Sequence, residues 1–226
     1  AACQSRRPKA VAVKVNFMNE GNTAPAGYEK DFGQAFGTNQ TQDGYDYGWK
    51  KVADDQPIDV SNLAPGNNNG SGRNRLGNGY ASATTQEQLE GSLLLHMQGN
   101  LLASWAGQPR SNEVYWEISI PYGTYEVKIG AGDYSTGSDP EVHTLNVEGI
   151  SFISTHIPQG SNFARVTDNT LVVNVSDGTL TVNAFGGINT KITYIEITES
   201  TDFPIAAGIL SFDPSPLVAS VTTGES

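Results

Sequence analysis

Short runs in which apolar and polar residues alternate recur along the chain, and they constrain its fold more than any other feature. A period of two places every second side chain on one face of an extended segment, so each run predicts a strand with one buried face. The clearest runs cover residues 11–17, 114–120, 125–129, 142–147, 171–175, 180–184 and 192–197. Eight or so short strands and few helical signals predict an all-β fold, an antiparallel jelly-roll β-sandwich with long loops at one end.

Turn signals and one ambiguous segment refine this expectation. Residues 175–180 read Val-Ser-Asp-Gly-Thr-Leu, which predicts a tight hairpin whose two strands are antiparallel neighbours. Between residues 84 and 97, Leu89, Leu93 and Met97 fall at helical spacing, but Gly91 interrupts them. Residues 92–97 fit a buried strand equally well, and we favour the strand. Residues 19–75 contain few aliphatic alternations and predict a long loop region.

The composition places the chain among extracellular β proteins. It has 226 residues, 16% of them charged, and a formal net charge of -11. Such a length can bury a self-sufficient core, and we expect one large β domain plus tails. The acidic balance argues against nucleic acid as a partner, because a nucleic-acid backbone calls for a basic face. We therefore expect a secreted or cell-surface protein.

The two ends of the chain differ from its body. Residues 1–9 are polar and basic and predict a disordered leader, residues 10–199 the sandwich domain, and residues 200–226 a linker or the start of a following module. Cys3 is the single cysteine, which excludes an internal disulfide framework. Its surroundings fit a lipoprotein cleavage site, a trimmed export signal or a cloning junction. No apolar run approaches the ~20 residues that cross a bilayer.

The segment from Tyr125 to Tyr134 carries the first functional signal. Its strand pattern stops at Gly130, and Asp133 and Tyr134 follow on a loop at the edge of the sheet. There an aromatic ring can stack on the face of a pyranose, while a carboxylate accepts hydrogen bonds from its hydroxyl groups. Such a pair suits a sugar.

An ordered set of short motifs resembles the malectin-like carbohydrate-binding domains of secreted bacterial proteins, over residues 11–198. These motifs are Val15-Asn-Phe17, Gly27-Tyr28, Asp31-Phe-Gly33, Tyr47-Gly-Trp49, Arg73-x-Arg75, Trp116-Glu-Ile-x-Ile-Pro121, Gly132-Asp133, His143-x-x-x-Val147-x-Gly149, Asp177-Gly-x-Leu180 and Asn189-Thr-Lys191. The resemblance implies a jelly roll that binds glycans without catalysis, through loops at one end, and that is often joined to other domains. It also implies that Phe32 and Tyr134 face the sugar. Ser135 and Ile188 stand where animal malectin has an aromatic residue and an aspartate, so its disaccharide specificity is not implied.

Further aromatic residues are candidates for stacking. Tyr45, Tyr47 and Trp49 alternate within residues 43–49, which presents them on one side of an extended segment. Either Tyr47 and Trp49 form a stacking platform or they anchor a long loop onto the core, and tryptophan is highly buried on average. Tyr45 and Phe36 are weaker candidates. The predicted carbohydrate-binding residues are Phe32, Tyr47, Trp49, Asp133 and Tyr134.

Charged residues near these segments are candidates for ligand or metal binding, but each also has a purely structural interpretation. Arg73 and Arg75 could hold an acidic sugar, but in so acidic a chain an ion pair with a carboxylate is the favoured reading. Asp133, Asp139 and Glu141 could bind a structural Ca²⁺, with a solvated loop as the favoured alternative. The three histidines, His96, His143 and His156, lack the spacing of a zinc site, and His143 reads as a packed strand residue. We expect no required cofactor.

Three functions remain open from the sequence. The first is non-catalytic binding of a poly- or oligosaccharide by one module of a larger polypeptide, with no enzyme activity. The second is a glycan-cleaving hydrolase or lyase that uses Asp31 or Asp133 as acid or base. The third is a structural or adhesin module without a ligand, in which the aromatic residues belong to the core. A nucleophile elbow and a dinucleotide-binding loop are both missing from the sequence.

Overall fold

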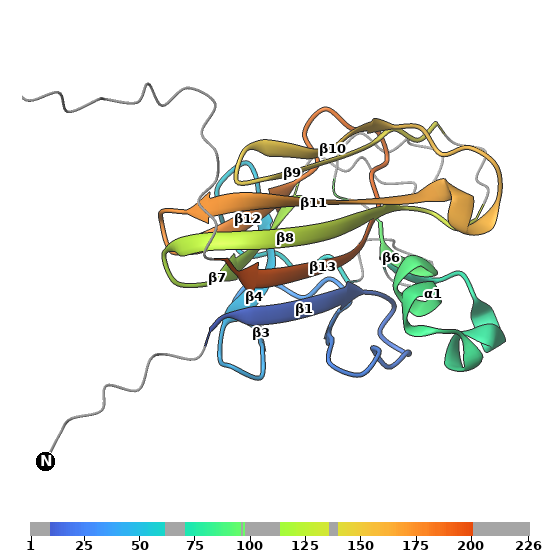
Figure 1. The fold of residues 1–226 in the computed structure, drawn as a ribbon, viewed down its shortest axis with the longest axis horizontal. Helices are drawn as coiled ribbons and strands as arrows, with labels where there is room; N and C mark the ends of the chain where they lie inside the picture. Colours follow the sequence, from blue (N-terminus) through green and yellow to red (C-terminus); the bar gives the residue numbers. More distant parts are fainter. Residues whose placement is uncertain (1–9, 62–70, 96, 98–113, 136–139, 201–226) are drawn as a thin grey trace, which may run out of the picture.

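Two β-sheets pack face to face in the computed structural model, which describes residues 10–61, 71–95, 97, 114–135 and 140–200 (Figure 1). The predicted β-sandwich is confirmed. The first sheet, sheet A, contains β1 (Ala12–Phe17), β2 (Glu29–Asp31), β5 (Gly72–Asn74), β6 (Ser92–Leu94), β8 (Gly123–Gly132), β11 (Val166–Val175) and β13 (Ile192–Glu199). The second, sheet B, contains β3 (Asn39–Gln40), β4 (Asp46–Lys51), β7 (Val114–Ser119), β9 (His143–Val147), β10 (Ile150–His156) and β12 (Thr179–Asn183).

The strand pairing is almost entirely antiparallel. Sheet A runs in the order β11-β8-β13-β1-β2, with β6 beside β13 and β5 beside β6, and sheet B runs β10-β9-β12-β7-β4-β3. The exception among the described pairs is β1 with β2, which are parallel. Alternating residues of both sheets point inward, and Trp49, Trp116 and Phe17 meet edge to face between the sheets.

A buried carboxylate ties the two sheets together. Asp31 lies at the end of β2 in sheet A and is fully buried. The indole N–H groups of Trp49 on β4 and Trp116 on β7 donate to its two oxygens, each at 2.9 Å, and the Gly33 N–H donates at 2.8 Å. Burial raises the pKa of Asp31 to about 6, because desolvation outweighs these hydrogen bonds, which lower it.

The predicted hairpin at residues 175–180 is wrong. Although Asp177-Gly178 forms a turn, with Gly178 at φ +91°, β11 pairs with β8 in sheet A while β12 pairs with β7 and β9 in sheet B. The turn is therefore an arch between the sheets. A tight-turn sequence reports the local backbone conformation, and it does not say whether the flanking strands pair with each other or with strands of opposite sheets.

The ambiguous segment contains both a helix and a strand. Helix α1 (Thr85–Glu90) begins after Thr84 in a capping box with Glu87, and β6 follows directly after Gly91. The favoured strand is thus confirmed over the first half of residues 92–97. The region predicted as loop, residues 19–75, contains β2 to β5, since the aromatic alternation of residues 45–49 belongs to a strand. Strand β10 was also missed, because register shifts in its pairing with β9 break the alternation.

Loops and short helices gather at one end of the sandwich. Strand β13 runs antiparallel to both β1 and β8, so its start lies beside the ends of these two strands. Strand β2 is parallel to β1, so it ends at the same side. The 3₁₀ helices η1 (Gly77–Ser82) and η2 (Asn162–Arg165) and helix α1 lie at this end, on the right in Figure 1. None of the helices within the described residues has the length and apolarity to span a membrane. The predicted leader, residues 1–9, and all of the predicted C-terminal linker except Ser200 lie outside the described residues.

Candidate functional site

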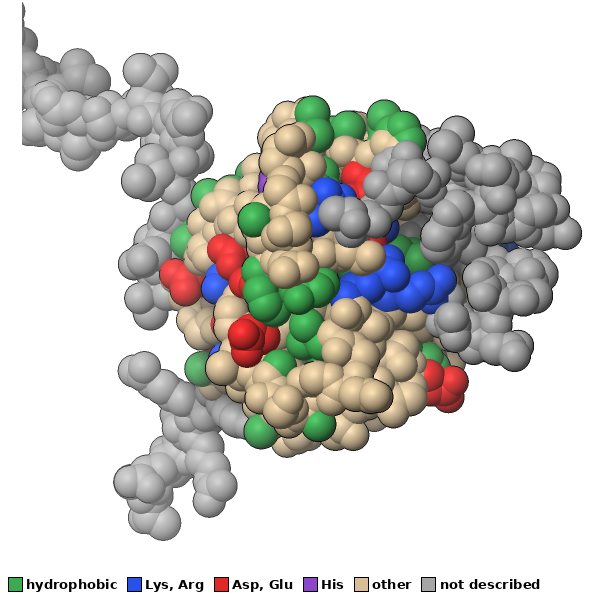
Figure 2. Space-filling model, turned by 90° about the vertical axis from the view of Figure 1, so that its right-hand side faces the viewer, with side chains coloured by type: hydrophobic (Ala, Val, Ile, Leu, Met, Phe, Trp, Pro, Cys, Tyr) green, Lys and Arg blue, Asp and Glu red, His purple; other side chains and the backbone are tan. Residues whose placement is uncertain are grey.

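An open pocket of about 370 Å³ lies at the end of the sandwich where the loops gather. Its lining comes from the segment after β5, from η1, α1 and η2, and from the loop after β8: Arg75, Leu76, Gly79, Ala83, Glu87, Tyr134 and Phe163. Figure 2 looks onto this end of the molecule and shows apolar and basic side chains next to each other. The pocket thus combines aromatic rings with one cation and one carboxylate.

The backbone around Gly132 brings the two aromatic rings together. Gly132 has φ +141°, and a Cβ there would lie 2.5 Å from the carbonyl oxygen of Arg165, so this close approach of β8 and η2 requires glycine. The Ser135 N–H then donates to Asp133 Oδ1 at 2.9 Å, which turns the chain after the strand. Tyr134 and Phe163 meet edge to face, with centroids 4.8 Å apart, and both are half-buried.

Asp133 fixes the cationic wall of the pocket. Its carboxylate accepts two hydrogen bonds from the Arg75 guanidinium, from Nε at 2.8 Å and from Nη2 at 2.6 Å. Lys191 Nζ lies 3.7 Å from the same carboxylate. Asp133 is 2% exposed, whereas the Arg75 side chain keeps 23% of its surface exposed. A bidentate pair of this kind holds the guanidinium in a single orientation.

A second buried carboxylate lies behind this wall. Glu141 contacts the Lys191 ammonium, Arg165 Nη2 at 3.1 Å and, at 3.6 Å, Nε2 of the buried His143. Burial acts to raise the pKa of Glu141, but His143 and Lys191 lower it to about 2. Arg165 Nε also donates to the backbone oxygen of Asp133 at 3.0 Å. This network therefore connects η2 to the loop that carries Tyr134.

Glu87 supplies the anionic wall. Its Oε2 accepts hydrogen bonds from both the backbone N–H and the hydroxyl of Thr84, each at 2.8 Å, which holds the side chain in place. These bonds lower the pKa of Glu87, so it stays ionised at neutral pH. Its other oxygen, Oε1, accepts no hydrogen bond from the described residues and is available to a ligand.

The two residues predicted at the strand end behave differently. Tyr134 lines the pocket, as the sequence suggested for a ring at this edge. The prediction that Asp133 touches the sugar is wrong, because its carboxylate is buried and engaged by Arg75 and Ser135. Asp133 is a positioning residue that acts through the neighbouring side chains.

Tyr47 and Trp49 are core residues, and their prediction as sugar-binding residues is wrong. They are 3% and 0% exposed, and the Tyr47 hydroxyl donates to the Lys30 carbonyl oxygen at 3.2 Å. Their alternation marks the inward face of β4, where large aromatic surfaces gain most from burial. Tyr45 packs partly against the same core.

Phe32 is half-buried but does not line the pocket with Tyr134. Its ring lies 5.4 Å from the Lys30 ammonium, and Phe36 lies 4.5 Å from that of Lys50. The fully buried Asp31 holds two indole groups and cannot reach a substrate, which removes it as the acid or base of the enzymatic alternative.

The ion-pair reading of Arg75 is confirmed by its bond to Asp133. Arg73 is 9% exposed, and its Nη1 donates to the Gly72 carbonyl oxygen at 2.9 Å. Asp133 and Glu141 give their oxygens to cationic side chains and do not fit a Ca²⁺ site, and Asp139 lies outside the described residues, as does His96. No group of three or more His, Cys, Asp or Glu side chains that could hold a metal occurs in the part of the chain described. His143 is packed in its strand, as predicted.

Phe163 and Glu87 were not found from the sequence. Phe163 follows Gly160-Ser-Asn162 and precedes β11, so an aromatic residue in a glycine-containing loop at a strand end was the available signal. The capping box Thr84-x-x-Glu87 was visible as a helix start, but nothing in it indicates that the helix adjoins Tyr134.

A second open pocket, of about 420 Å³, lies between the sheet edges β10 and β11. Ser154, Thr155, Thr167, Asp168 and Asn169 give it a largely polar lining. The Asn169 amide bridges it by donating to the Phe152 carbonyl oxygen at 2.6 Å. The Phe152 ring is 3% exposed, so none of the Phe, Tyr or Trp rings described offers this pocket a face for stacking, and the Tyr134 pocket is the better candidate site.

Comparisons with known proteins give no family. No family model matches the chain, and no curated protein shows significant similarity to it. Among solved structures, protein YxiM from Bacillus subtilis is similar over 87% of this chain and 42% of its own, with 13% identity and a TM-score of 0.42. The Bacteroides uniformis β-glucuronidase matches over 84% of this chain and 18% of its own, with 11% identity and a TM-score of 0.43. A family 35 carbohydrate-binding module from Clostridium thermocellum matches over 38% of this chain and 71% of its own, with 16% identity and a TM-score of 0.25.

The chain thus spans less than half the length of the first two of these structures. Their TM-scores are too low to support an argument about function.

Proposed function

We propose that the chain is a non-catalytic carbohydrate-binding module that holds a poly- or oligosaccharide at the pocket of Tyr134 and Phe163. The observation that carries this proposal is the half-exposed aromatic pair beside a fixed guanidinium and an available carboxylate oxygen. A pyranose presents an apolar face of C–H groups and a rim of hydroxyl groups. The pocket offers a counterpart to each.

The groups of the pocket are held before any ligand arrives. Arg75 is fixed by Asp133, Glu87 by Thr84, and the Tyr134 ring by Phe163 and the turn at Asp133. Arg75 Nη1 makes no hydrogen bond to the described residues and can donate to a hydroxyl oxygen. Preorganised contacts reduce the entropy cost of binding, which matters in a shallow site.

Non-catalytic binding fits the pocket better than cleavage. A glycosidase needs two carboxyl groups about 5 to 10 Å apart around the scissile bond. Glu87 is the single carboxylate among the described lining residues, since Asp31 is buried in the core and Asp133 is engaged by Arg75. A hydrolase or lyase is the second candidate, and a module without a ligand is the third. Tyr134 is only half-buried, and a module without a ligand gives no reason for this partly exposed ring.

The proposal includes the setting of the module. The acidic, weakly charged composition and the ordered motifs support a malectin-like domain of a secreted or surface protein, with neighbouring domains on the same polypeptide. The contacts come from side chains alone, so the proposal requires no cofactor.

A panel of polysaccharides separates the three functions. The protein is incubated with each polysaccharide, and both retention on the polymer and release of soluble products are measured. Retention without products is the expected result. Release of products would establish the enzymatic alternative, and no retention by any member of the panel, with the fold intact, would leave the structural module.

A further inference from the structure

We propose that Glu87 is a specificity-determining residue of the Tyr134 pocket, and that it makes the pocket take neutral sugars in preference to uronic acids. This inference rests on the proposed function. It identifies the chemical class of the ligand from the charges that line the pocket.

The cation of the pocket is already balanced. Both Nε and Nη2 of Arg75 donate to Asp133, at 2.8 and 2.6 Å, so its positive charge faces a carboxylate at contact distance. The remaining N–H groups of Arg75 can donate hydrogen bonds to hydroxyl oxygens. The Arg75–Asp133 pair has no net charge, so it gives a second anion little electrostatic attraction. A sugar carboxylate would have to compete with Asp133 for the guanidinium.

Two other cations described at this end of the sandwich, Lys191 and Arg165, lie behind the pocket wall. Lys191 is 3% exposed and Arg165 is 9% exposed, and both contact Glu141. Arg73 is buried to the same degree as Arg165 and donates to the Gly72 carbonyl oxygen. None of the three lines the pocket. Lys191 is paired with Asp133 and Glu141, and Arg165 is paired with Glu141, so the positive charges of these two side chains face carboxylates.

The anion of the pocket faces the ligand directly. Glu87 lines the pocket and is held by Thr84, with its Oε1 available and its charge retained at neutral pH. A hydroxyl group can donate a hydrogen bond to this oxygen. The C6 carboxylate of a uronate cannot, because both carboxylates are acceptors and like charges repel at short range. Glu87 therefore favours a hexose with a hydroxymethyl group over the corresponding uronic acid.

The capping box provides a clean variant. Glutamine is accepted at the third position of a capping box, so Glu87→Gln removes the charge and keeps an acceptor for Thr84. Glu90→Gln is the matched control. It removes the same charge from the same helix, but Glu90 accepts a bond from Gln86 and does not line the pocket.

The experiment is isothermal titration with neutral hexose oligosaccharides and with the same oligosaccharides oxidised at C6 to uronic acids. For the native protein we expect the neutral member of each pair to bind about tenfold more tightly, a difference that two like charges a few ångströms apart can supply. Glu87→Gln is expected to remove most of this preference, and Glu90→Gln to leave it unchanged. The preference of the native protein should also fall as salt is added.

Equal or tighter binding of the uronic acids by the native protein would overturn the inference and leave glycan binding intact. So would a preference that Glu87→Gln does not change. If the native protein binds neither member of any pair with its fold intact, the proposed function fails, and the inference fails with it.

Discussion

Arg75 and Asp133 form a bidentate ion pair, with N–O distances of 2.8 and 2.6 Å, that joins the segment after β5 to the end of β8. One side of this pair is the pocket and the other is the buried network of Lys191, Arg165 and Glu141. The pair therefore fixes Arg75 and the loop that carries Tyr134, both of which the proposed ligand would touch, although Asp133 itself touches none of it.

Replacing Asp133 should damage both stability and binding. Asp133→Asn leaves Arg75 and Lys191 without their shared carboxylate, and losing one partner of a buried pair costs about 3 kcal/mol of unfolding free energy. Urea denaturation measures this. The control is Asp54→Asn, whose pair with Lys51 at 3.7 Å is more exposed and should cost less than about 1 kcal/mol. An equal loss of unfolding free energy in the two variants would contradict the structural role proposed for the Asp133 carboxylate.

The buried Asp31 should give the stability an unusual dependence on pH. Its pKa is raised from 3.8 to about 6, so the folded state binds more protons than the unfolded state between these values. The contribution of Asp31 to stability is therefore fully present below pH 3.8 and falls as the pH rises to about 6, by about 3 kcal/mol at most.

Comparison with Asp31→Asn isolates this effect, because the variant does not titrate at residue 31. Denaturation across pH 3.5 to 7 should show the stability of the native protein relative to the variant falling with pH. A relative stability that rises over that range would mean that the indole hydrogen bonds outweigh the desolvation of the carboxylate.

Trp49 should contribute to stability and not to glycan binding. Trp49→Phe keeps a large ring in the core but removes the donor to Asp31, which costs about 1 to 3 kcal/mol. Under conditions where the variant is folded, its affinity for a bound polysaccharide should equal that of the native protein. A selective loss of affinity without a loss of stability would restore the stacking platform that the sequence suggested.

Gly132 should be required for the position of Tyr134. In Gly132→Ala the new Cβ meets the Arg165 carbonyl oxygen at 2.5 Å, so β8 and η2 must separate and the aromatic pair is disturbed. We expect a loss of about 2 kcal/mol or more in stability, together with weaker glycan binding. Gly149→Ala is the control, since Gly149 also has a positive φ, of +74°, but no atom lies within 4 Å of the added Cβ. It should cost about 1 kcal/mol and leave binding unchanged.

Most of the strands could be predicted from the sequence because alternation reports burial directly. The runs around Val15, Trp116 and Val127 form β1, β7 and β8. Alternation does not report which strands are neighbours, so the arch at Asp177-Gly178 was taken for a hairpin. Pairing depends on packing between segments that are distant in the sequence.

The site was only partly predictable for a related reason. Tyr134 was found because it follows a strand end, but the same chemistry at Tyr47 and Trp49 belongs to the core. An aromatic alternation looks the same whether its buried side or its exposed side carries the rings. Glu87 and Phe163 join the pocket through contacts between α1, η2 and the loop after β8, which no local pattern encodes.

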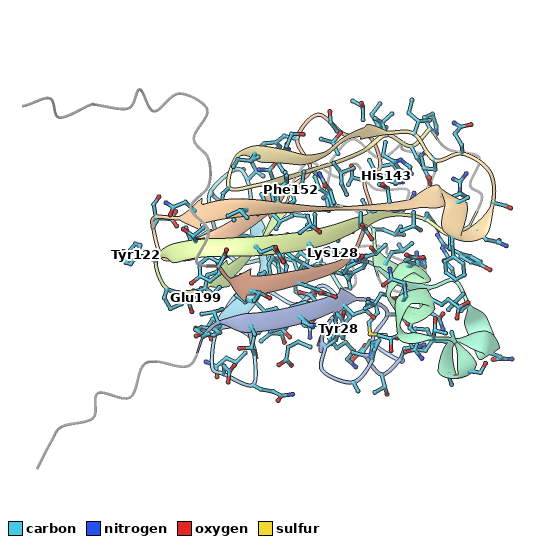
Figure 3. The ribbon with its side chains drawn as sticks, in the orientation of Figure 1. Tyr28, Tyr122, Lys128, His143, Phe152 and Glu199 are labelled. Atoms are coloured by element: carbon cyan, nitrogen blue, oxygen red, sulfur yellow. The ribbon has the colours of Figure 1, made fainter. Side chains whose placement is uncertain are left out.

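Binding at the Tyr134 pocket is tested most directly by isothermal titration with a polysaccharide that the native protein retains. The polysaccharide is titrated separately into the native protein, into Tyr134→Ala and into Tyr122→Ala. Tyr122 is 73% exposed and lies at the end of the sandwich opposite to α1, so it controls for the loss of an exposed tyrosine (Figure 3). We predict that Tyr134→Ala loses at least about tenfold in affinity, as expected for one stacking ring, and that Tyr122→Ala binds like the native protein. A folded Tyr134→Ala variant with native affinity would contradict this prediction.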